Sequence, residues 1–247
     1  MSHWEFPTSD PVDLHVRVSS GSVTVRAAAT QTATVTIEGN GSGSRAEQAL
    51  AATKVEFDQN TLSVTAPDHP PWGRGVSLDI TVEIPEGSSC LVRTASADVG
   101  CTGPLSAIDV QTASGDVGAE QISGLARVVT ASGDVHIGEA AEVNADSASG
   151  DVGITRATGP VTVRTASGDV RIAEASGGRA EVTSASGDIS VAVAPGNGVY
   201  LDLSSLSGMV SSDLEPAEES GGATLTVHCR TLSGDVRVIR ATPAAAR

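Results

Sequence analysis

The chain has 247 residues, of which 39% are hydrophobic but only 2% aromatic, and its formal net charge at pH 7 is −15. Such an acidic surface repels phosphate backbones and anionic lipids, which argues against nucleic-acid binding and against membrane binding. A core with so few rings must be built from Val, Ile, Leu, Ala and Thr, which pack well in strands.

The ends of the sequence and its cysteine content predict a cytoplasmic protein. No stretch approaches the roughly 20 apolar residues that a transmembrane helix needs. The first ten residues have neither the basic segment nor the apolar run of a secretory signal. Three cysteines cannot form a complete set of disulfides, which is typical of a reducing compartment.

The first 89 residues carry two alternating apolar patterns that predict strands on either side of a tight corner. Val16 and Val18 precede a Ser-Gly-Ser corner and Val23 and Val25 follow it, while residues 55–64 repeat the pattern around Gln-Asn. Residues 44–52 suit a short helix, and residues 67–75 form a loop rich in Pro and Gly that contains Trp72. Residues 76–84 then alternate as a strand.

A Ser-Gly-Asp-Val corner, or a close variant of it, recurs eight times between residues 90 and 240. Its serines are Ser96, Ser114, Ser132, Ser149, Ser167, Ser186, Ser207 and Ser233. Most steps are near 18 residues, and a unit that short cannot bury an apolar face alone, so the units must stack. We therefore predict an all-β fold: a single continuous parallel β-solenoid over residues 1–247. It has degenerate coils at 1–89, regular repeats at 90–240 and a tail at 241–247. Right-handed crossovers are preferred, although this period also suits left-handed coils.

Alignment on the corner serines separates inward from outward positions. We expect inward side chains two and four residues before the serine and three and five after it, such as Val128, Thr130, Val135 and Ile137 around Ser132. A second corner follows about half a repeat later at Gly-Pro, Gly-Gly or single Gly positions, so each coil contains two main strands. The inward columns then form one continuous core along the stack.

The acidic residue of the corner predicts a row of carboxylates along one edge. Its members are Asp98, Asp116, Asp134, Asp151, Asp169, Asp188 and Asp235, and Met209 interrupts the row. Carboxylates this close need either backbone N–H donors or bound cations. One acid per 18 residues is too few for the six to eight oxygens of a Ca²⁺ site, so hydrogen bonding in the turn is favoured over calcium binding.

Other residues that could carry chemistry also fit structural roles. The Thr and Ser column before the corner has inward parity, which predicts a buried hydroxyl ladder that satisfies itself rather than an ice-binding face. Cys90, Cys101 and Cys229 occupy core columns and are expected to be buried small hydrophobes rather than ligands or nucleophiles. His136 and His228 fall in outward columns and indicate solvated surface.

The sequence offers few places for a functional site. No nucleophile motif, phosphate loop or zinc pattern is present, and the corners are too short to build a catalytic cleft. Room exists only in the Trp72 loop and in the acidic insertion at 211–222. We expect the last strand, with Arg237 and Arg240, to be an open edge where a partner or a second copy docks, and Met209 to mark a degraded corner.

The repeat units resemble the DUF4097 family of β-strand-repeat proteins, which carry the label of putative adhesins. The resemblance rests on the serial Thr-Ala-Ser-Gly-Asp-Val units at 112–170, the closing unit at 227–238, and the segments Leu-Ser-Val-Thr-Ala-Pro at 62–67 and Val-Glu-Ile-Pro-Glu-Gly-Ser at 82–88. It implies a β-solenoid and brings no catalytic residues.

The sequence thus predicts a non-enzymatic cytoplasmic β-solenoid that serves as a scaffold or protein-binding module and self-associates through its open end. It needs no cofactor or metal. The alternative is a cell-surface or envelope-associated adhesin-like protein, followed by a calcium-binding solenoid and a carbohydrate-active enzyme. A protein partner is expected, whereas nucleic acid and membrane are not.

Overall fold

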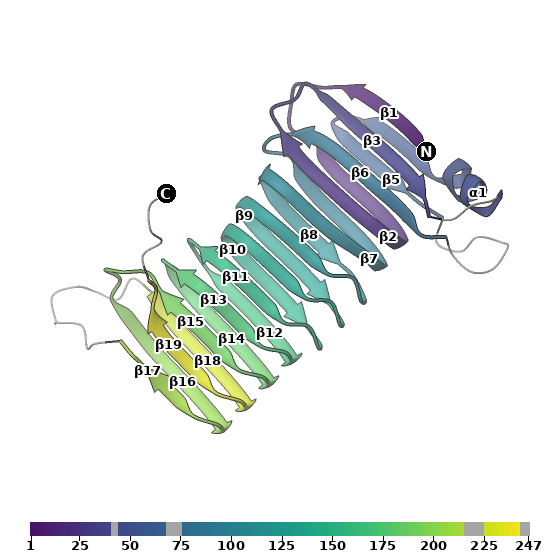
Figure 1. Cartoon of the computed structure of the whole chain (residues 1–247). Helices are drawn as coiled ribbons and strands as arrows, with labels where there is room; N and C mark the ends of the chain where they lie inside the picture. Colours follow the sequence, from purple (N-terminus) through teal and green to yellow (C-terminus); the bar gives the residue numbers. More distant parts are fainter. Residues whose placement is uncertain (41–43, 68–75, 215–224, 243–247) are drawn as a thin grey trace.

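The computed structural model describes residues 1–40, 44–67, 76–214 and 225–242. Within these ranges the chain forms a single sheet of 19 strands coiled into an elongated stack (Figure 1). The N-terminal strands and helix are β1 (Ser2–Pro7), β2 (Asp13–Ala28), β3 (Thr32–Gly39), α1 (Ser44–Ala52), β4 (Lys54–Asp58), β5 (Thr61–Thr65) and β6 (Leu78–Pro85). The all-β solenoid and the short helix at 44–52 are confirmed.

The repeat region contains the remaining strands, and all of its pairings are parallel. They are β7 (Ser89–Leu105), β8 (Ala107–Gln111), β9 (Val117–Thr130), β10 (Val135–Ser147), β11 (Val152–Ala157), β12 (Val161–Ser167), β13 (Val170–Ala175), β14 (Gly178–Ser186), β15 (Ile189–Val193), β16 (Val199–Ser207), β17 (Val210–Ser212), β18 (Leu225–Ser233) and β19 (Val236–Arg240). Equivalent residues pair from coil to coil, as in Val135↔Val117 and Val135↔Val152. A fixed register follows because a slip by one residue would turn every apolar side chain outward.

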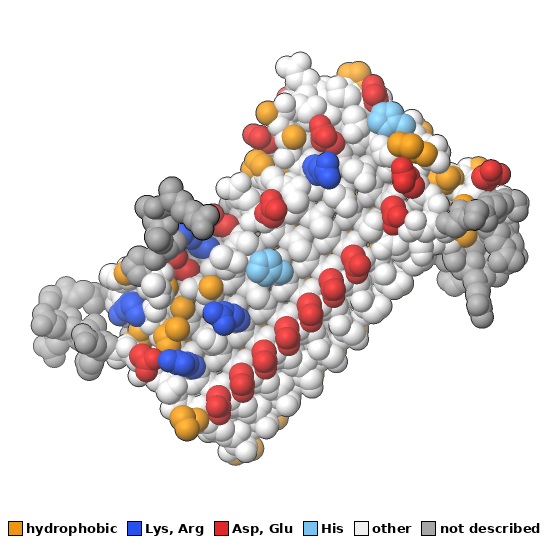
Figure 2. Space-filling view, viewed as in Figure 1, with side chains coloured by type: hydrophobic (Ala, Val, Ile, Leu, Met, Phe, Trp, Pro, Cys, Tyr) orange, Lys and Arg blue, Asp and Glu red, His pale blue; other side chains and the backbone are white. Residues whose placement is uncertain are grey.

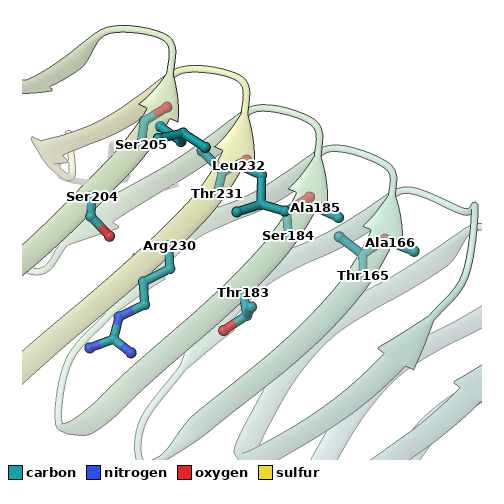
Figure 3. A pocket seen from close by; sticks show the side chains of 11 residues that line it. Thr165, Ala166, Thr183, Ser184, Ala185, Ser204, Ser205, Arg230, Thr231 and Leu232 are labelled. Atoms are coloured by element: carbon teal, nitrogen blue, oxygen red, sulfur yellow. The ribbon is translucent and has the colours of Figure 1, made fainter.

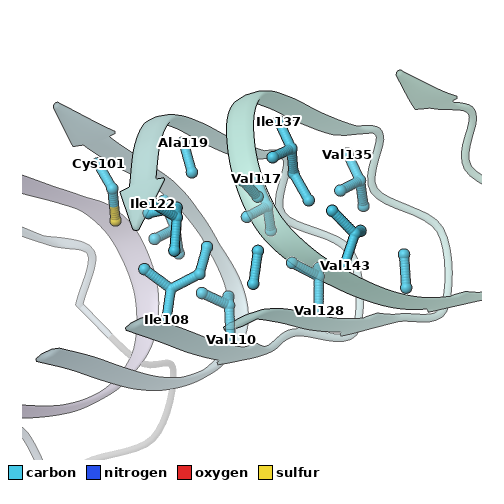
Figure 4. Packing of buried hydrophobic residues seen from close by; sticks show 14 of the residues in the cluster. Cys101, Ile108, Val110, Val117, Ala119, Ile122, Val128, Val135, Ile137 and Val143 are labelled. Carbon is cyan, nitrogen blue, oxygen red and sulfur yellow. The ribbon is translucent and has the colours of Figure 1, made fainter. Parts of the chain in front are cut away.

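The core is a column of aliphatic side chains between the two sheet faces (Figure 4). Val128, Ile137, Val163 and Val182 are all fully buried, as the inward columns predict. Rings lie at the N-terminal end of this column instead, where Phe6 and Phe57 meet at 5.4 Å between ring centroids. β-branched side chains therefore fill the interior of the repeats, and aromatic ones close one end.

The N-terminal region is not a simple series of early coils, which corrects part of the prediction. β2 pairs in parallel with β7 on one side and with β5 and β6 on the other, so these strands do form coils. However, β4 runs antiparallel to β5, β3 antiparallel to β6, and β1 antiparallel to β3. These antiparallel strands continue the sheet beyond β5 and β6 at the N-terminal end of the stack, and helix α1 contacts β3.

The C-terminal coils are stacked in a different order from their order in the sequence. β18 lies between β14 and β16, and β19 lies between β15 and β17. The outermost coil is therefore β16 with β17, and the chain returns to fill the gap before it (Figure 1). The predicted open edge at 237–240 is wrong for Arg237 and Val238, because β19 pairs with β15 over residues 236–240 and with β17 at residues 236–238.

Helix α1 has nine residues, and no helix in the described ranges is long and apolar enough to cross a membrane.

Candidate functional site

The inward hydroxyl column caps the corners of the central coils. The Gly115 and Gly133 N–H groups donate to Thr112 Oγ1 and Thr130 Oγ1 at 3.0 and 2.9 Å, and the Gly150 N–H donates to Ser147 Oγ at 2.9 Å. Each hydroxyl therefore satisfies the backbone of its own corner. The prediction that these hydroxyls bond to one another is wrong, since a buried N–H three residues onward is the nearer partner.

The corners change their hydrogen bonding in the last coils. The Gly168, Gly187 and Gly234 N–H groups donate to the carbonyl oxygen of a serine in the neighbouring coil, at 2.9–3.1 Å. Gly187 and Gly234 adopt φ values of 145° and 138°, where side chains are rarely accommodated. As a result, the buried hydroxyl oxygens of Thr165 and Ser184 have no hydrogen-bond partner. The corner is thus reshaped near the C-terminal end of the stack.

The aspartate row is a chain of hydrogen bonds between coils. From Asp98 to Asp188, each Oδ1 accepts the backbone N–H of the next aspartate at 2.8–3.0 Å, as in Asp134 N–H to Asp116 and Asp151 N–H to Asp134. Figure 2 shows the row as a line of acidic side chains along one edge. Backbone N–H donors therefore offset the repulsion between neighbouring carboxylates, as predicted. However, the hydrogen bonds join neighbouring coils, whereas the prediction placed them within one turn. In the described ranges no group of three or more His, Cys, Asp or Glu residues could hold a metal ion.

Met209 stands at the end of the aspartate row rather than interrupting it. Its N–H donates to Asp235 Oδ1 at 2.8 Å, and Asp235 in turn donates to Asp188. Because the coil of β16 and β17 is outermost, no further coil needs an acceptor from position 209. The loss of the carboxylate at this position marks the last coil of the stack.

Exposed apolar side chains gather at this outermost coil and its neighbour. We call Tyr200, Leu206, Met209, Val210 and Leu232 the C-terminal apolar surface. Leu206 is 83% exposed, Met209 70% and Leu232 59%. The large hydrophobic residues exposed elsewhere in the described ranges are Met1 and Leu125. Leu206 and Leu232 lie on neighbouring strands, β16 and β18, so these two exposed leucines adjoin.

A groove of about 630 Å³ lies beside this surface, across β12, β14, β18 and β16 (Figure 3). Its lining includes Ala166, Ala185, Leu206 and Leu232, which occupy the outward position just before each corner serine. Alanine fills this position in the coils from 95 to 185, and leucine replaces it in the last two. The groove therefore forms where small outward side chains give way to large ones.

Polar groups at the rim of the groove are paired with one another. His228 Nδ1 lies 3.0 Å from Asp202 Oδ2, and Arg230 Nη2 lies 3.5 Å from the same oxygen. The hydrogen bond from His228, with the nearby charge of Arg230, lowers the pKa of the Asp202 carboxyl. His228 is also half-buried beside Tyr200, with ring centroids 6.3 Å apart, rather than freely solvated as expected. The rim thus carries a neutralised cluster and not a free cation.

The residues predicted as interaction sites have separate positions. Met209 belongs to the C-terminal apolar surface, and Trp72 lies outside the described residues. Arg237 pairs with Asp213 at 3.0 Å, and Arg240 donates to the carbonyl oxygens of Ala194 and Asn197 at 3.2 and 3.0 Å. The two arginines therefore fix the second corner and the outermost coil. Sequence reasoning missed Tyr200, Leu206 and Leu232, although the change from Ala to Leu in one outward column was a visible signal.

The three cysteines lie in the core, as the column alignment predicts. The hydrogen bond that the Cys90 thiol donates to Cys101, followed by burial, raises the pKa of Cys90 well above its ordinary value, and burial raises the pKa of Cys229 to about 12. Protonated, enclosed thiols are poor nucleophiles and poor metal ligands.

Fold and corner chemistry together define a parallel β-solenoid repeat protein with one apolar end. The family model described as Toastrack DUF4097 matches residues 13–239, and the chain belongs to this family. A search of curated proteins finds no match.

Two solved structures share the fold. One is described as "a putative adhesin" from Bacteroides fragilis NCTC 9343, with 14% identity, 96% of each chain covered and a TM-score of 0.63. Another is described as a "putative lipid binding protein" from Parabacteroides distasonis ATCC 8503, with 17% identity, 97% of this chain and 93% of that chain covered, and a TM-score of 0.51. At these identities the likeness concerns the fold.

Proposed function

We propose that this protein is a non-enzymatic, adhesin-like binding protein that holds a partner macromolecule in the groove at the C-terminal end of its solenoid. The observation that carries the proposal is the apolar groove of about 630 Å³, with Leu232 and Leu206 on its lining and largely exposed. Exposing such side chains to water is unfavourable, so a partner that covers them gains hydrophobic free energy.

The frame of the groove suits binding better than catalysis. Four neighbouring strands in fixed register hold the lining, and neither residue shift nor bulge interrupts the pairing of β14 with β18 or of β16 with β18. A rigid lining loses little conformational entropy when a partner binds. The pairing of Asp202 with His228 and Arg230 leaves this rim without a free general base. We therefore expect an apolar side chain of an extended peptide segment to fill the groove.

A bead assay tests this function. Purified protein is coupled to beads, and adhesion is measured to a panel of bacterial cells, animal cells and immobilised matrix proteins. Wild-type beads should adhere to at least one surface. The double variant Ala185→Asp/Leu232→Asp should reduce adhesion by at least about tenfold, because two carboxylates would be desolvated beside each other. Ala185 and Leu232 are neighbours through the pairs Ser184↔Thr231 and Ser186↔Ser233.

The matched control is Ala113→Asp/Leu125→Asp, which places the same two changes on exposed residues of earlier coils. It should adhere like the wild type. Equal loss in both double variants, or no adhesion by wild-type beads to any surface, would overturn the proposal. Fractionation of the source cells tests the location: adhesion requires the protein at or outside the cell surface, and a purely cytoplasmic protein, as the sequence predicts, would count against the adhesin-like function.

A further inference from the structure

The outermost coil ends in strand edges without partners. In the described ranges β16 pairs only with β18 and β17 only with β19. The Leu225 N–H donates to the Gly198 carbonyl oxygen, and in a parallel ladder alternate residues point their backbone groups to the same side. The N–H and C=O groups of Leu201, Leu203 and Ser205 therefore face the open edge of β16. Such an edge is a template for another strand.

We propose that two copies of this chain join end to end, with β16 of one copy running antiparallel to β16 of the other about a twofold axis at Leu203. Tyr200 and Leu206 lie three residues to either side of Leu203. Both point outward, whereas Leu203 points toward the core. The axis therefore places Tyr200 opposite the partner's Leu206, and this pair occurs twice. The contact would cover residues that are 60% and 83% exposed in the single chain.

The charges on β16 select this register among its neighbours. An axis at Leu203 sets Asp202 opposite the partner's Ser204. An axis at residue 202 would face Asp202 with its own copy, and an axis at residue 204 would set Asp202 against the partner's Leu206. Both alternatives bring a carboxylate against an unsuitable partner, at about 5 Å between opposing residues. Only the Leu203 axis pairs apolar with apolar and acid with hydroxyl.

Electrostatics permits this contact despite the net charge of −15. Within residues 199–214 the two acids of the outermost coil are engaged within their own chain, Asp202 by His228 and Arg230, and Asp213 by Arg237. The carboxylates of β16 and of the end of β17 are therefore paired where the two strands meet, whereas the aspartate row lies along the side of the rod (Figure 2). Repulsion between the two rods acts over longer distances, where salt screens it.

The other end of the molecule is protected against the same kind of pairing. In the described ranges this end has two edge strands, β4 and β1. β4 exposes Lys54, Glu56 and Asp58 in alternation and β1 exposes His3, Glu5 and Pro7, and charged side chains or proline on an edge oppose the addition of a further strand. A head-to-tail contact would build an open filament, whereas a twofold contact closes. The loss of the carboxylate at Met209 fits closure, since no further parallel coil follows.

The proposal shares Leu206 with the proposed function but not Ala185 or Leu232. Light scattering during size-exclusion chromatography should show twice the chain mass of 24.7 kDa at micromolar concentration. Tyr200→Lys alone and Leu206→Asp alone should each weaken the dimer at least about tenfold. The double variant Tyr200→Lys/Leu206→Asp should restore it, because each changed residue meets the opposite charge across the axis. The two positions are too far apart on one strand to pair within a chain.

A cross-link tests the register. Tyr200 and the partner's Leu206 form a pair whose backbone groups point away from each other, with Cα atoms about 4.5 Å apart, a spacing that suits a disulfide. Air oxidation of Tyr200→Cys/Leu206→Cys should therefore give a covalent dimer on a non-reducing denaturing gel. Either single variant lacks the second cysteine of the pair and should run as a monomer on that gel. The native cysteines are buried and do not compete.

Monomeric wild-type protein up to about 200 µM, or no recovery in the charge-reversed double variant, would overturn the dimer. Ala185→Asp/Leu232→Asp should leave the dimer intact while adhesion falls. Adhesion by a protein that is strictly monomeric would therefore refute this inference alone, and a dimer that does not adhere would refute the proposed function alone.

Discussion

At the scale of single residues, the aspartate row shows how one side chain stabilises a neighbouring coil. Asp134 Oδ1 accepts the Asp151 N–H at 2.9 Å, and its own N–H donates to Asp116. The carboxylate therefore supplies an acceptor that the adjacent coil needs. This explains why the residue recurs once per repeat and is absent from the last coil.

Two replacements of Asp134 separate the contribution of its hydrogen-bond acceptor to stability from the contribution of its charge. Asp134→Ala leaves the Asp151 N–H without its partner and should lower the free energy of unfolding by about 1 kcal/mol. Asp134→Asn keeps an acceptor oxygen and should cost less than half of that. Urea denaturation followed by circular dichroism measures both, and equal losses for the two variants would contradict the role of the hydrogen bond.

The buried thiols make stability depend on alkaline pH. Burial raises the folded-state pKa of Cys229 from 9.0 to about 12. Its contribution is therefore fully present below pH 9 and is lost as pH rises through this window, because only the unfolded state releases the proton. Cys229→Val, which copies its neighbour Val182 in the register, should flatten the fall in unfolding free energy between pH 9 and 11. A pH series of urea titrations checks this; identical slopes would refute it.

At the scale of elements, the corner exists in two forms that use the same hydroxyl differently. Thr130 Oγ1 accepts the Gly133 N–H at 2.9 Å, whereas Thr165 Oγ1 is buried without a partner. Buried polar groups without partners are unfavourable. The corners next to the groove are therefore less stable than the corners of the central coils. The leucines that line the groove lie beside these less stable corners.

A pair of matched substitutions tests the two corner forms. Thr130→Val should destabilise the protein by about 1–3 kcal/mol, because the Gly133 N–H loses its acceptor. Thr165→Val should be neutral or stabilising, since it removes a hydroxyl that bonds to nothing and keeps the shape of the side chain. Thermal unfolding of the two variants gives the comparison. A larger loss for Thr165→Val than for Thr130→Val would contradict the assignment.

At the scale of the whole molecule, the exchanged order of the last two coils makes the segment 199–224 more dispensable than the segment that follows it. Deletion of residues 199–224 removes the outermost coil and joins two positions that already touch, since the Leu225 N–H donates to the Gly198 carbonyl at 3.2 Å. The shortened stack should stay folded and cooperative. Deletion of residues 213–247 instead removes β18 and β19 from between their neighbours, and β16 and β17 should lose hydrogen-exchange protection.

Hydrogen exchange read by mass spectrometry distinguishes these outcomes peptide by peptide. Protection of β14 and β15 should persist in the first deletion. Full protection of β16 and β17 in the second deletion would show that the outermost coil stacks equally well on β14 and β15, and would contradict the need for the inserted coil.

The sequence by itself determined the period, the inward columns, the short helix and the burial of the cysteines. These depend on local alternation and on residues such as Val128 and Ile137, whose side-chain direction follows from the strand itself. Only the tertiary structure decided which coils are neighbours. Every coil presents nearly the same apolar columns, so β14 could accept either β16 or β18 on local grounds. The choice depends on long-range stacking and on which corner, here that of Met209, lacks the acceptor for a further coil. The apolar end, the groove and the dimer contact all follow from that choice.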